Sequence, residues 1–486
     1  MSRRYPNSYE AGPMGIRGKQ AKRKGTKHMK KVISAMLLIC MIGMLTACGA
    51  KAPEAEKEEY TPQAQVAESH TESVDEKEPE EVPREQAPEG IEAVEKSEEA
   101  SPIAEKPQIL SLQETRKARY EGVNDFEKFL MINKFNYVTF WEGEETYPEM
   151  ARMMSETAGM ITRSQEDEAD NMVSFAQEMF DVDSYFETQI STVDVQVRRA
   201  DSVAVSYLTD SYADYGFIED FRGMQGSNYD TQTGQQLVLT DVIKDMTQIP
   251  SLVTSELNNH LWAGEGYPET VLQDYFRNTP EDGISWTLDY NGVTFYFGDG
   301  DITEPGNGGQ AATISFAEHP ELFAEKYMNV PEAYMARLPL DSSFFTDLDG
   351  DGTLEELNVT GVYNEEGRFY SQFGIYTDTD GHYHYEDFYA YGYHPYYVKT
   401  ADGKHYLYLF CEENDADNRQ MMLVVFDVSD GQFVRAGEMN VAPAYIPSDN
   451  FILPLNPDNL LLDNFDSLEQ DFGIYMVGEN GMPIRK

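Results

Sequence analysis

The sequence predicts an α+β domain over residues 108–337, an antiparallel sheet with helices, followed by a mostly-β domain over residues 338–486, a sandwich or a propeller-like fold. Two observations support this. In the first segment apolar residues recur at helical spacing in some stretches and alternate with polar residues in others, as in helices and half-buried strands. In the second segment, runs rich in Tyr, Phe and Val are separated by Asp-Gly turns, a pattern typical of successive antiparallel strands.

Residues 1–47 form a signal region with an N-terminal extension, and Met29 is the expected start of translation. Lys30-Lys31, an apolar stretch and small residues before a cleavage point are typical of a secretory signal. The sequence Leu45-Thr-Ala-Cys48 resembles the lipobox of bacterial lipoproteins. That resemblance implies a lipid such as palmitate on Cys48, which anchors the chain to the outer face of the cell membrane. The alternatives are an ordinary signal peptide with an incidental cysteine and a short uncleaved anchor.

Residues 48–107 are expected to be a lipidated cysteine followed by a disordered acidic tether. Residues 51–107 hold 18 acidic and six basic residues, seven prolines and one aromatic residue. A segment with high net charge and little to bury cannot offset the entropy of folding. Repulsion between like charges and the prolines should keep it extended.

The charge of the chain excludes some classes of partner. From Cys48 onward there are 27 basic and 85 acidic residues, a net charge of -58. Such a body repels nucleic-acid phosphates and anionic lipid, so membrane attachment requires an anchor. Three cysteines are too few for a disulfide framework. Cys411 lies in an apolar run and is predicted to be a buried small hydrophobe.

The elements of the first domain are expected in this order. A strand covers residues 137–141, a helix begins at Pro148, and a second helical stretch covers 172–180. A hairpin then joins the strands 193–197 and 203–207. The remaining elements are a turn at Thr233-Gly234, helices over 250–262 and 269–277, a hairpin at Asn291-Gly292, a strand over 312–316 and a helix over 320–327.

Three motifs in this domain carry a resemblance to a known family. They are the block Tyr229-Asp…Thr-Gly234…Leu-x-Leu-x-Asp241, the strand 292–297, and a glycine-rich loop before residues 313–316. Together they resemble the extracytoplasmic domain shared by RsiV-type anti-sigma factors and some Gram-positive wall deacetylases. The resemblance covers residues 125–330 and implies an α+β domain, which in one branch binds lysozyme directly. An anti-sigma role is not expected, because it would require a cytoplasmic domain and a spanning helix.

The second domain contains several predicted strands and one sharp candidate site. The strands cover residues 370–376, 383–391, 405–411, 421–428 and 432–441. Before them, carboxylates spaced two apart and intervening glycines would direct several hard oxygens at one point, as Ca²⁺ requires. The expected ligands are the side chains of Asp347, Asp349, Asp351 and Glu355 and the backbone carbonyl of Thr353.

This loop resembles the calcium loops of integrin-type β-propeller repeats more than an EF-hand. Its flanks are strand-like, and Asn358 stands where an EF-hand has its last Glu. The alternative is a solvated acidic turn without metal.

A second candidate cation site lies in a Tyr-rich hairpin. Alternation along a strand would place His382, His384 and Glu386 on one face, where they could hold Zn²⁺ or Cu²⁺. The same pattern also occurs on exposed hairpin faces without any metal. No nucleophile or metallohydrolase motif is present, so we expect no enzyme.

The sequence therefore predicts a binding or sensing lipoprotein of the cell envelope. Its expected ligand is an extracellular protein such as lysozyme, which a strongly acidic body would attract, or a cell-wall glycan such as peptidoglycan. The alternatives are an accessory scaffold of cell-wall modification and a hydrolase with an unrecognised site.

Overall fold

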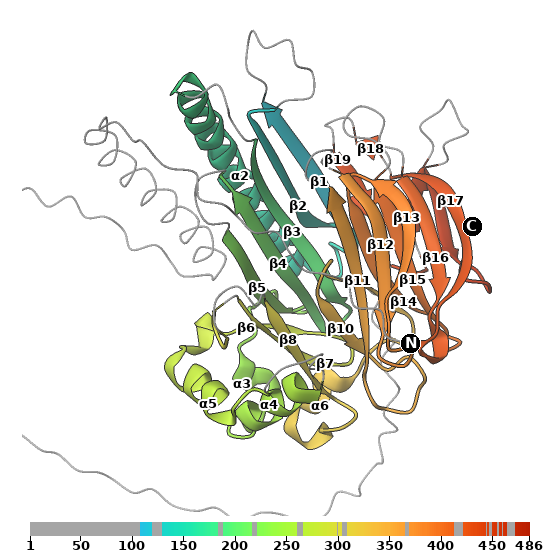
Figure 1. Ribbon diagram of the computed structural model, residues 1–486. Coiled ribbons are helices and arrows are strands. Elements are labelled where there is room, and N and C mark those ends of the chain that lie inside the picture. Colours follow the sequence, from blue (N-terminus) through green and yellow to red (C-terminus); the bar gives the residue numbers. More distant parts are fainter. Residues whose placement is uncertain are drawn as a thin grey trace, which may run out of the picture.

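A computed structural model describes much of the chain after residue 106 (Figure 1). The described ranges are 107–118, 129–182, 188–215, 221–259, 266–298, 300–303, 309–364, 369–412, 421–443, 445–446, 450–453, 456–458, 460–463 and 472–486. This part of the chain is mostly β, with several antiparallel sheets and few helices.

The first sheet has seven strands in the order β18-β19-β1-β2-β3-β4-β5. The strands are β1 Gln108–Ala118, β2 Met131–Glu142, β3 Gln189–Ala200, β4 Ala204–Asp214, β5 Phe221–Asp230, β18 Tyr445–Ile446 and β19 Asn450–Leu453. Their neighbours are antiparallel except β2 and β3, which are parallel. Parallel neighbours require a long crossover, and helix α2 provides it. The hairpin predicted for the two strands after this crossover is confirmed as β3 and β4.

Helix α2, Pro148–Val182, is 35 residues long and begins at Pro148, as predicted. The two predicted helical stretches are parts of this one helix. Its buried side includes Met150, Met154, Met172 and Ala176, which pack against the first sheet. Among the described residues, no helix has the length and apolar character needed to cross a membrane.

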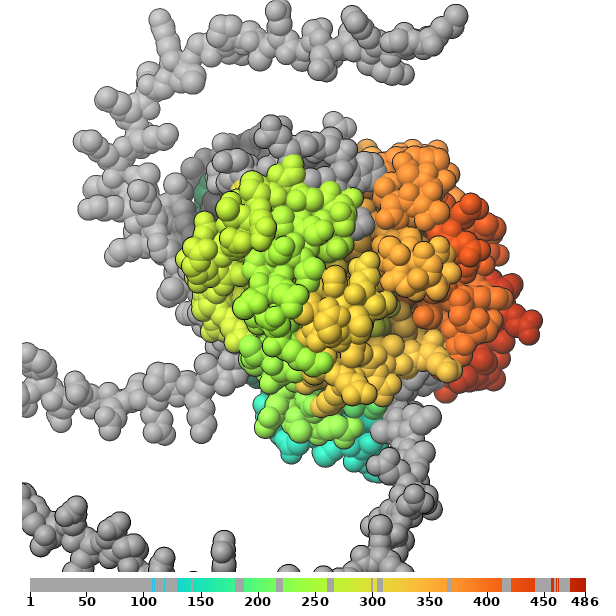
Figure 2. Space-filling view, turned by 90° about the horizontal axis from the view of Figure 1, so that it is seen from below, coloured from blue at the N-terminus to red at the C-terminus, as the bar shows by residue number. Residues whose placement is uncertain are grey.

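A smaller three-stranded sheet carries the short helices. Its strands are β6 Ser285–Leu288, β7 Gly292–Phe297 and β8 Gln310–Ser315, and the predicted turn at Asn291-Gly292 joins the first two. The helices packed against it are α3 Leu239–Val242, α4 Ile249–Asn259, α5 Glu269–Asn278 and α6 Glu325–Met328. In Figure 2 the green and yellow surface of this part lies beside the orange surface of the later strands.

Strand β5 approaches this small sheet so closely that only glycine fits at one position. A Cβ built on Gly226 would lie 1.8 Å from the carbonyl oxygen of Trp286. The side-chain amide of Asn228 also donates to this carbonyl, at 2.9 Å. The small sheet is therefore fastened directly to the edge of the first sheet.

The later strands form a two-sheet sandwich. One sheet is β10-β11-β12-β13, and the other has eight strands in the order β22-β21-β20-β17-β16-β15-β14-β9. Their bounds are β9 Tyr334–Arg337, β10 Ser343–Thr346, β11 Glu355–Asn364, β12 Phe369–Thr377, β13 His384–Ala390, β14 Tyr393–Lys399, β15 His405–Glu412, β16 Met421–Asp427, β17 Val434–Pro443, β20 Leu460–Asp463, β21 Phe472–Val477 and β22 Pro483–Arg485.

The eight-stranded sheet is covered on both faces. Along β15, Leu407, Leu409 and Cys411 pack in a cluster with the four-stranded sheet. The residues between them, including Tyr408 and Phe410, belong to a different cluster that reaches the seven-stranded sheet. Alternate residues of a strand point to opposite faces, so this sheet serves two hydrophobic cores at once.

The larger of these cores crosses the division expected at residue 338. It joins Val138 of β2 and Met150 of α2 to Tyr396, Tyr408 and Leu460. Strand β9, which precedes residue 338 in the sequence, belongs to the eight-stranded sheet. Residues 108–337 and 338–486 therefore pack against each other through shared apolar side chains.

Buried arginines also link the first sheet to the three-stranded sheet and to strand β9. The Arg198 guanidinium is 2.9 Å from the Asp289 carboxylate, and it also donates to the Arg337 carbonyl at 3.0 Å. The neighbouring Arg199 donates to the Tyr327 carbonyl at 2.7 Å. Several acceptors offset the free energy that is lost when a guanidinium is removed from water. Removal of one acceptor would leave a buried positive charge without its full set of partners, which is strongly destabilising.

A second buried group links β2 to the eight-stranded sheet. Glu412 accepts hydrogen bonds from Lys134 at 2.7 Å and from the His394 ring. Burial alone would raise the pKa of the Glu412 carboxyl, but Lys134 and His394 hold it well below its ordinary value. Burial and the nearby Arg337 charge lower the pKa of His394 to about 4, so its imidazole is neutral near pH 7.

Candidate cation sites and an exposed tyrosine face

The acidic loop 347–354 connects strands β10 and β11, whose last pair is Thr346 and Glu355. Gly350 and Gly352 have φ values of 79° and 93°, which side chains other than glycine rarely adopt. Leu348 is buried, and its carbonyl accepts from the Asp430 amide at 3.1 Å. The loop is thus curled tightly and fixed to the turn before β17.

Three of the predicted ligands meet in this loop. One carboxylate oxygen each of Asp347, Asp349 and Glu355 lies within 4.8 Å of the others. The Asp351 carboxylate is not in this group and accepts from the Thr353 amide at 2.7 Å. The Asp347 oxygens accept from the amides of Gly350 and Gly352, at 2.6 and 3.1 Å. These bonds hold the Asp347 carboxylate at the centre of the loop.

The electrostatics of the loop favour a cation. Partial burial, followed by the carboxylates of Asp349, Asp347 and Asp378, raises the pKa of Glu355 to about 7. The three converging groups are hard oxygen donors of the kind that Ca²⁺ takes, and the remaining positions would fall to backbone carbonyls and water. The donor set therefore fits calcium.

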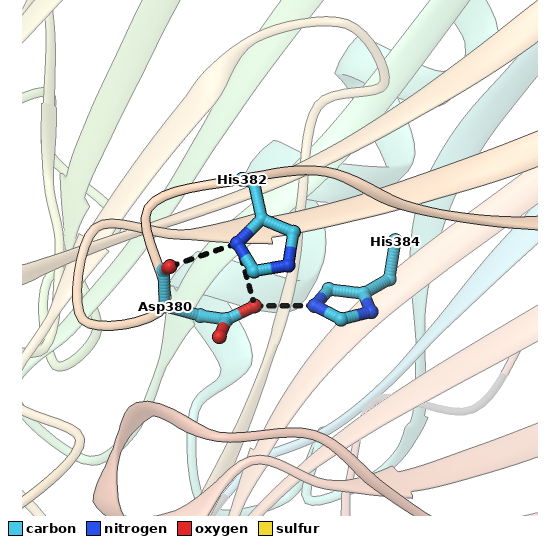
Figure 3. Close-up of side chains that lie close together, drawn as sticks. All are labelled: Asp380, His382 and His384. Atoms are coloured by element: carbon cyan, nitrogen blue, oxygen red, sulfur yellow. Dashed lines mark hydrogen bonds and ion pairs between the residues drawn. The ribbon is translucent and has the colours of Figure 1, made fainter. Parts of the chain in front are cut away.

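A second cluster lies in the turn between β12 and β13 (Figure 3). One ligand atom each of Asp380, His382 and His384 lies within 4.8 Å of the others. The Nε2 atom of His384 is hydrogen-bonded to the Asp380 carboxylate. The Nδ1 atom of His382 is 3.0 Å from the backbone oxygen of Asp380 and 3.6 Å from its carboxylate.

The third member of this cluster differs from the one expected. Alternation predicted Glu386, but the Glu386 carboxylate pairs with Arg435 of β17 at 2.5 Å. The strand begins only at His384, and the chain before it turns at Gly381, which brings Asp380 to the histidines instead. The spacing Asp380-x-His382-x-His384 was a signal in the sequence that could have identified it.

Four tyrosines lie on the outer face of the four-stranded sheet; two of them are exposed, one is partly exposed, and Tyr376 is buried. Leu357, Val359, Phe373 and Ile375 point into the sandwich core, so the residues between them point outward. On that side the rings of Tyr376 and Tyr383 are 5.3 Å apart, and those of Tyr383 and Tyr385 are 5.7 Å apart. Tyr385 is 53% exposed, and Tyr389, further along β13, is 70% exposed. We call Tyr376, Tyr383, Tyr385 and Tyr389 the tyrosine face.

A glycine and several polar groups shape this face. A Cβ on Gly374 would lie 2.7 Å from the Tyr385 ring, so the ring lies directly over the sheet backbone. The Tyr383 hydroxyl donates to the Asn358 side chain at 3.1 Å. Gln372 and Asp387 are hydrogen-bonded to each other across β12 and β13. The sequence analysis did not predict this face, although Tyr383, Tyr385 and Tyr389 share the odd-numbered positions of one strand.

The two cysteine predictions have different outcomes. Cys411 is a buried thiol in β15, which confirms the expected small hydrophobe. Cys48 and the tether lie outside the described residues, so the lipid anchor stays a prediction.

Comparison with known proteins gives little further information. No protein-family model matches the chain, and no curated protein matches it. A member of the DUF3298 family from Bacteroides fragilis is similar at 14% identity and a TM-score of 0.36, over 46% of this chain and 96% of that chain. A DUF3298 family protein from Pseudomonas aeruginosa is similar at 14% identity and a TM-score of 0.30, over 47% and 99%. Similarities this low carry no argument, so the function proposed below rests on the residues of this chain.

Proposed function

We propose that this protein is a binding lipoprotein of the cell envelope whose tyrosine face takes a neutral glycan strand of the cell wall. The observation that carries the proposal is the exposure of Tyr385 and Tyr389 on the outer face of a rigid sheet. A single exposed aromatic side chain is common on protein surfaces, whereas several grouped on one face are typical of an interaction site.

The chemistry of the tyrosine face suits a sugar. A pyranose ring has an apolar face that packs on an aromatic ring and a rim of hydroxyls that need hydrogen-bond partners. Tyrosine supplies the apolar surface and a polar end, while Gln372 and Asp387 supply donors and acceptors beside it. The Tyr383 hydroxyl donates its proton to Asn358, which leaves the hydroxyl oxygen as an acceptor for a sugar hydroxyl.

The net charge of the chain indicates which kind of glycan it can bind. A net charge of -58 after residue 47 repels strongly anionic wall polymers and leaves neutral strands, such as the glycan chain of peptidoglycan, as the better ligand. In this proposal the lipid on Cys48 holds the protein at the outer face of the membrane. The acidic segment 48–107 then extends the folded part into the wall, and calcium in the loop of Asp347, Asp349 and Glu355 braces the sandwich.

The experiment is a pull-down of the full chain, purified in detergent, with insoluble peptidoglycan at low and high salt. We expect retention that changes little with salt, because stacking on tyrosine is not a charge interaction. The double substitution Tyr385→Ala and Tyr389→Ala should abolish it. Ile484→Ala is the matched control, since Ile484 is 50% exposed on strand β22, away from the tyrosine face.

Lysozyme is a second candidate ligand, favoured by the net charge of the chain and by the resemblance of residues 125–330 to RsiV-type domains. It is tested in the same experiment. Binding to lysozyme that falls steeply with salt and survives the tyrosine substitutions, without retention on peptidoglycan, would replace the glycan proposal. Retention of the tyrosine double variant on peptidoglycan would equally refute a role for this face.

A further inference from the structure

We infer that Asp380, His382 and His384 form a binding site for a divalent transition-metal ion of the zinc class. Figure 3 shows the three side chains directed at one another from a single turn. One donor atom from each falls within 4.8 Å of the others, a separation at which one ion can contact all three. The inference is independent of the tyrosine face and of the glycan proposal.

The donor types select the metal. Two imidazole nitrogens and one carboxylate oxygen suit Zn²⁺ and Cu²⁺, whereas Ca²⁺ and Mg²⁺ prefer oxygen ligands alone. In the absence of metal, the His384 ring and the Asp380 carboxylate are joined by a hydrogen bond. A bound ion would take the place of the proton between them. The charge balance also favours a cation, because the Asp380 carboxylate lies on a strongly acidic chain.

The turn that carries these ligands is held in place before any metal binds. The Asp380 amide donates to the Thr377 hydroxyl at 3.3 Å, and that hydroxyl donates to the Gly431 carbonyl at 2.6 Å. The His384 ring packs edge to face on Phe433, with ring centroids 4.8 Å apart. The ligands are thus fastened to the segment that leads into β17, and little conformational entropy remains to be lost on binding.

The exposure of the site leaves part of the coordination sphere open. The side chains of His382 and His384 are 65% and 47% exposed, and that of Asp380 is 29% exposed. Three protein ligands with solvent access leave a tetrahedral ion one position for water or for an external donor. The site is therefore distinct in chemistry from the oxygen-lined loop of Asp347, Asp349 and Glu355.

The test is calorimetric titration of Zn²⁺ into the full chain, purified in detergent without a polyhistidine tag and stripped of metal. We expect one zinc ion per chain at this site. His384→Gln should weaken zinc binding at least about tenfold, since even the loss of a partner behind a metal ligand commonly costs that much. The double substitution His382→Gln and His384→Gln should abolish it. His319→Gln, which removes a partly buried histidine 3.9 Å from a single carboxylate, is the matched control and should have no effect.

Two further measurements identify the zinc ligands and test whether the double variant is folded. X-ray absorption at the zinc edge should show two nitrogen ligands at about 2.0–2.1 Å. Unchanged far-ultraviolet circular dichroism of the double variant excludes unfolding as the cause of lost binding. The inference is overturned if the parent chain binds no zinc, if the double variant binds zinc as the parent does, or if excess Ca²⁺ displaces the zinc, because that outcome assigns the ion to the acidic loop.

Discussion

Calcium should stabilise this protein more at alkaline than at acidic pH, and Glu355→Gln should remove the difference. In the folded chain, partial burial and the carboxylates of Asp349, Asp347 and Asp378 raise the pKa of Glu355 from 4.5 to about 7. The folded state therefore binds a proton more tightly than the unfolded state does. Without calcium, the stabilising contribution of the Glu355 proton is complete below about pH 4.5 and is lost as the pH rises through about 7.

Two free energies can be estimated for this loop: the loss of stability when Glu355 ionises and the gain when calcium binds. At alkaline pH the ionised Glu355 would lower the free energy of unfolding by up to about 3 kcal/mol, as judged from its raised pKa. Solvent screening of this partly exposed loop reduces that loss to about 1 kcal/mol. A calcium ion that binds only the folded state contributes RT ln(1 + [L]/Kd). With a Kd of about 10⁻⁴–10⁻³ M, as in extracellular modules, about 2 mM calcium gives about 1 kcal/mol. For a chain of this size, that raises the melting temperature by roughly 1–2 °C.

The assay is a thermal melt of the full chain in detergent with and without calcium, at about pH 5.5 and about pH 8. The calcium shift should be largest at the higher pH, where Glu355 is ionised, and equal Mg²⁺ should not reproduce it because Mg²⁺ demands stricter geometry. Asp349→Asn should remove the shift. Asp402→Asn is the control, since Asp402 also precedes a glycine with positive φ, at 78° against 79° for Gly350. An absent calcium shift, or one that persists in Asp349→Asn, would show that the loop is a solvated acidic turn.

Two further predictions follow from residues outside these sites. Cys48→Ala should abolish labelling of the protein with a radioactive fatty acid in growing cells; equal labelling of parent and variant would place the anchor elsewhere. Asp289→Asn should lower the free energy of unfolding by about 3–5 kcal/mol in urea titrations, because it strands the buried Arg198 charge. Arg152→Ala, which breaks two exposed pairs on α2, should leave the urea midpoint almost unchanged, and an equal loss in both variants would contradict the argument from burial.

Local signals predicted the elements of this fold well. The start of α2 at Pro148 and the hairpin at Asn291-Gly292 depend on residues within a few positions of each other, and the structure has both. Strand β14 was not predicted; its third residue is Pro395, which cannot donate to a ladder and makes the segment atypical of a strand inside a sheet. The parallel pairing of β2 with β3 also depends on a tertiary arrangement that no short pattern specifies.

In the candidate sites, too, contacts between residues close in sequence were predicted and contacts between distant residues were not. The spacing of Asp347, Asp349 and Glu355 within one loop was enough to predict that their carboxylates meet. The role of Glu386 could not be predicted, because its partner Arg435 lies on a strand far away in the sequence. The exposure of the tyrosine face likewise depends on which side of the sheet is covered by another sheet, and only the assembled sandwich determines that.

The pairing of β1 with β19 constrains the order in which the parts of this protein can fold. Gln113 lies opposite Phe451, and Ile109 shares its hydrophobic cluster with Leu460 and Tyr475. Strand β1 pairs along one edge with β2, the next strand in the sequence, but the partner of its other edge, β19, follows much later in the chain. Until β19 pairs with β1, this edge of the first sheet is open and the apolar residues of its cluster lack part of their packing. Deletion of the strands from β19 onward should therefore leave an unpaired edge on β1 and an incomplete hydrophobic cluster, a combination that favours aggregation.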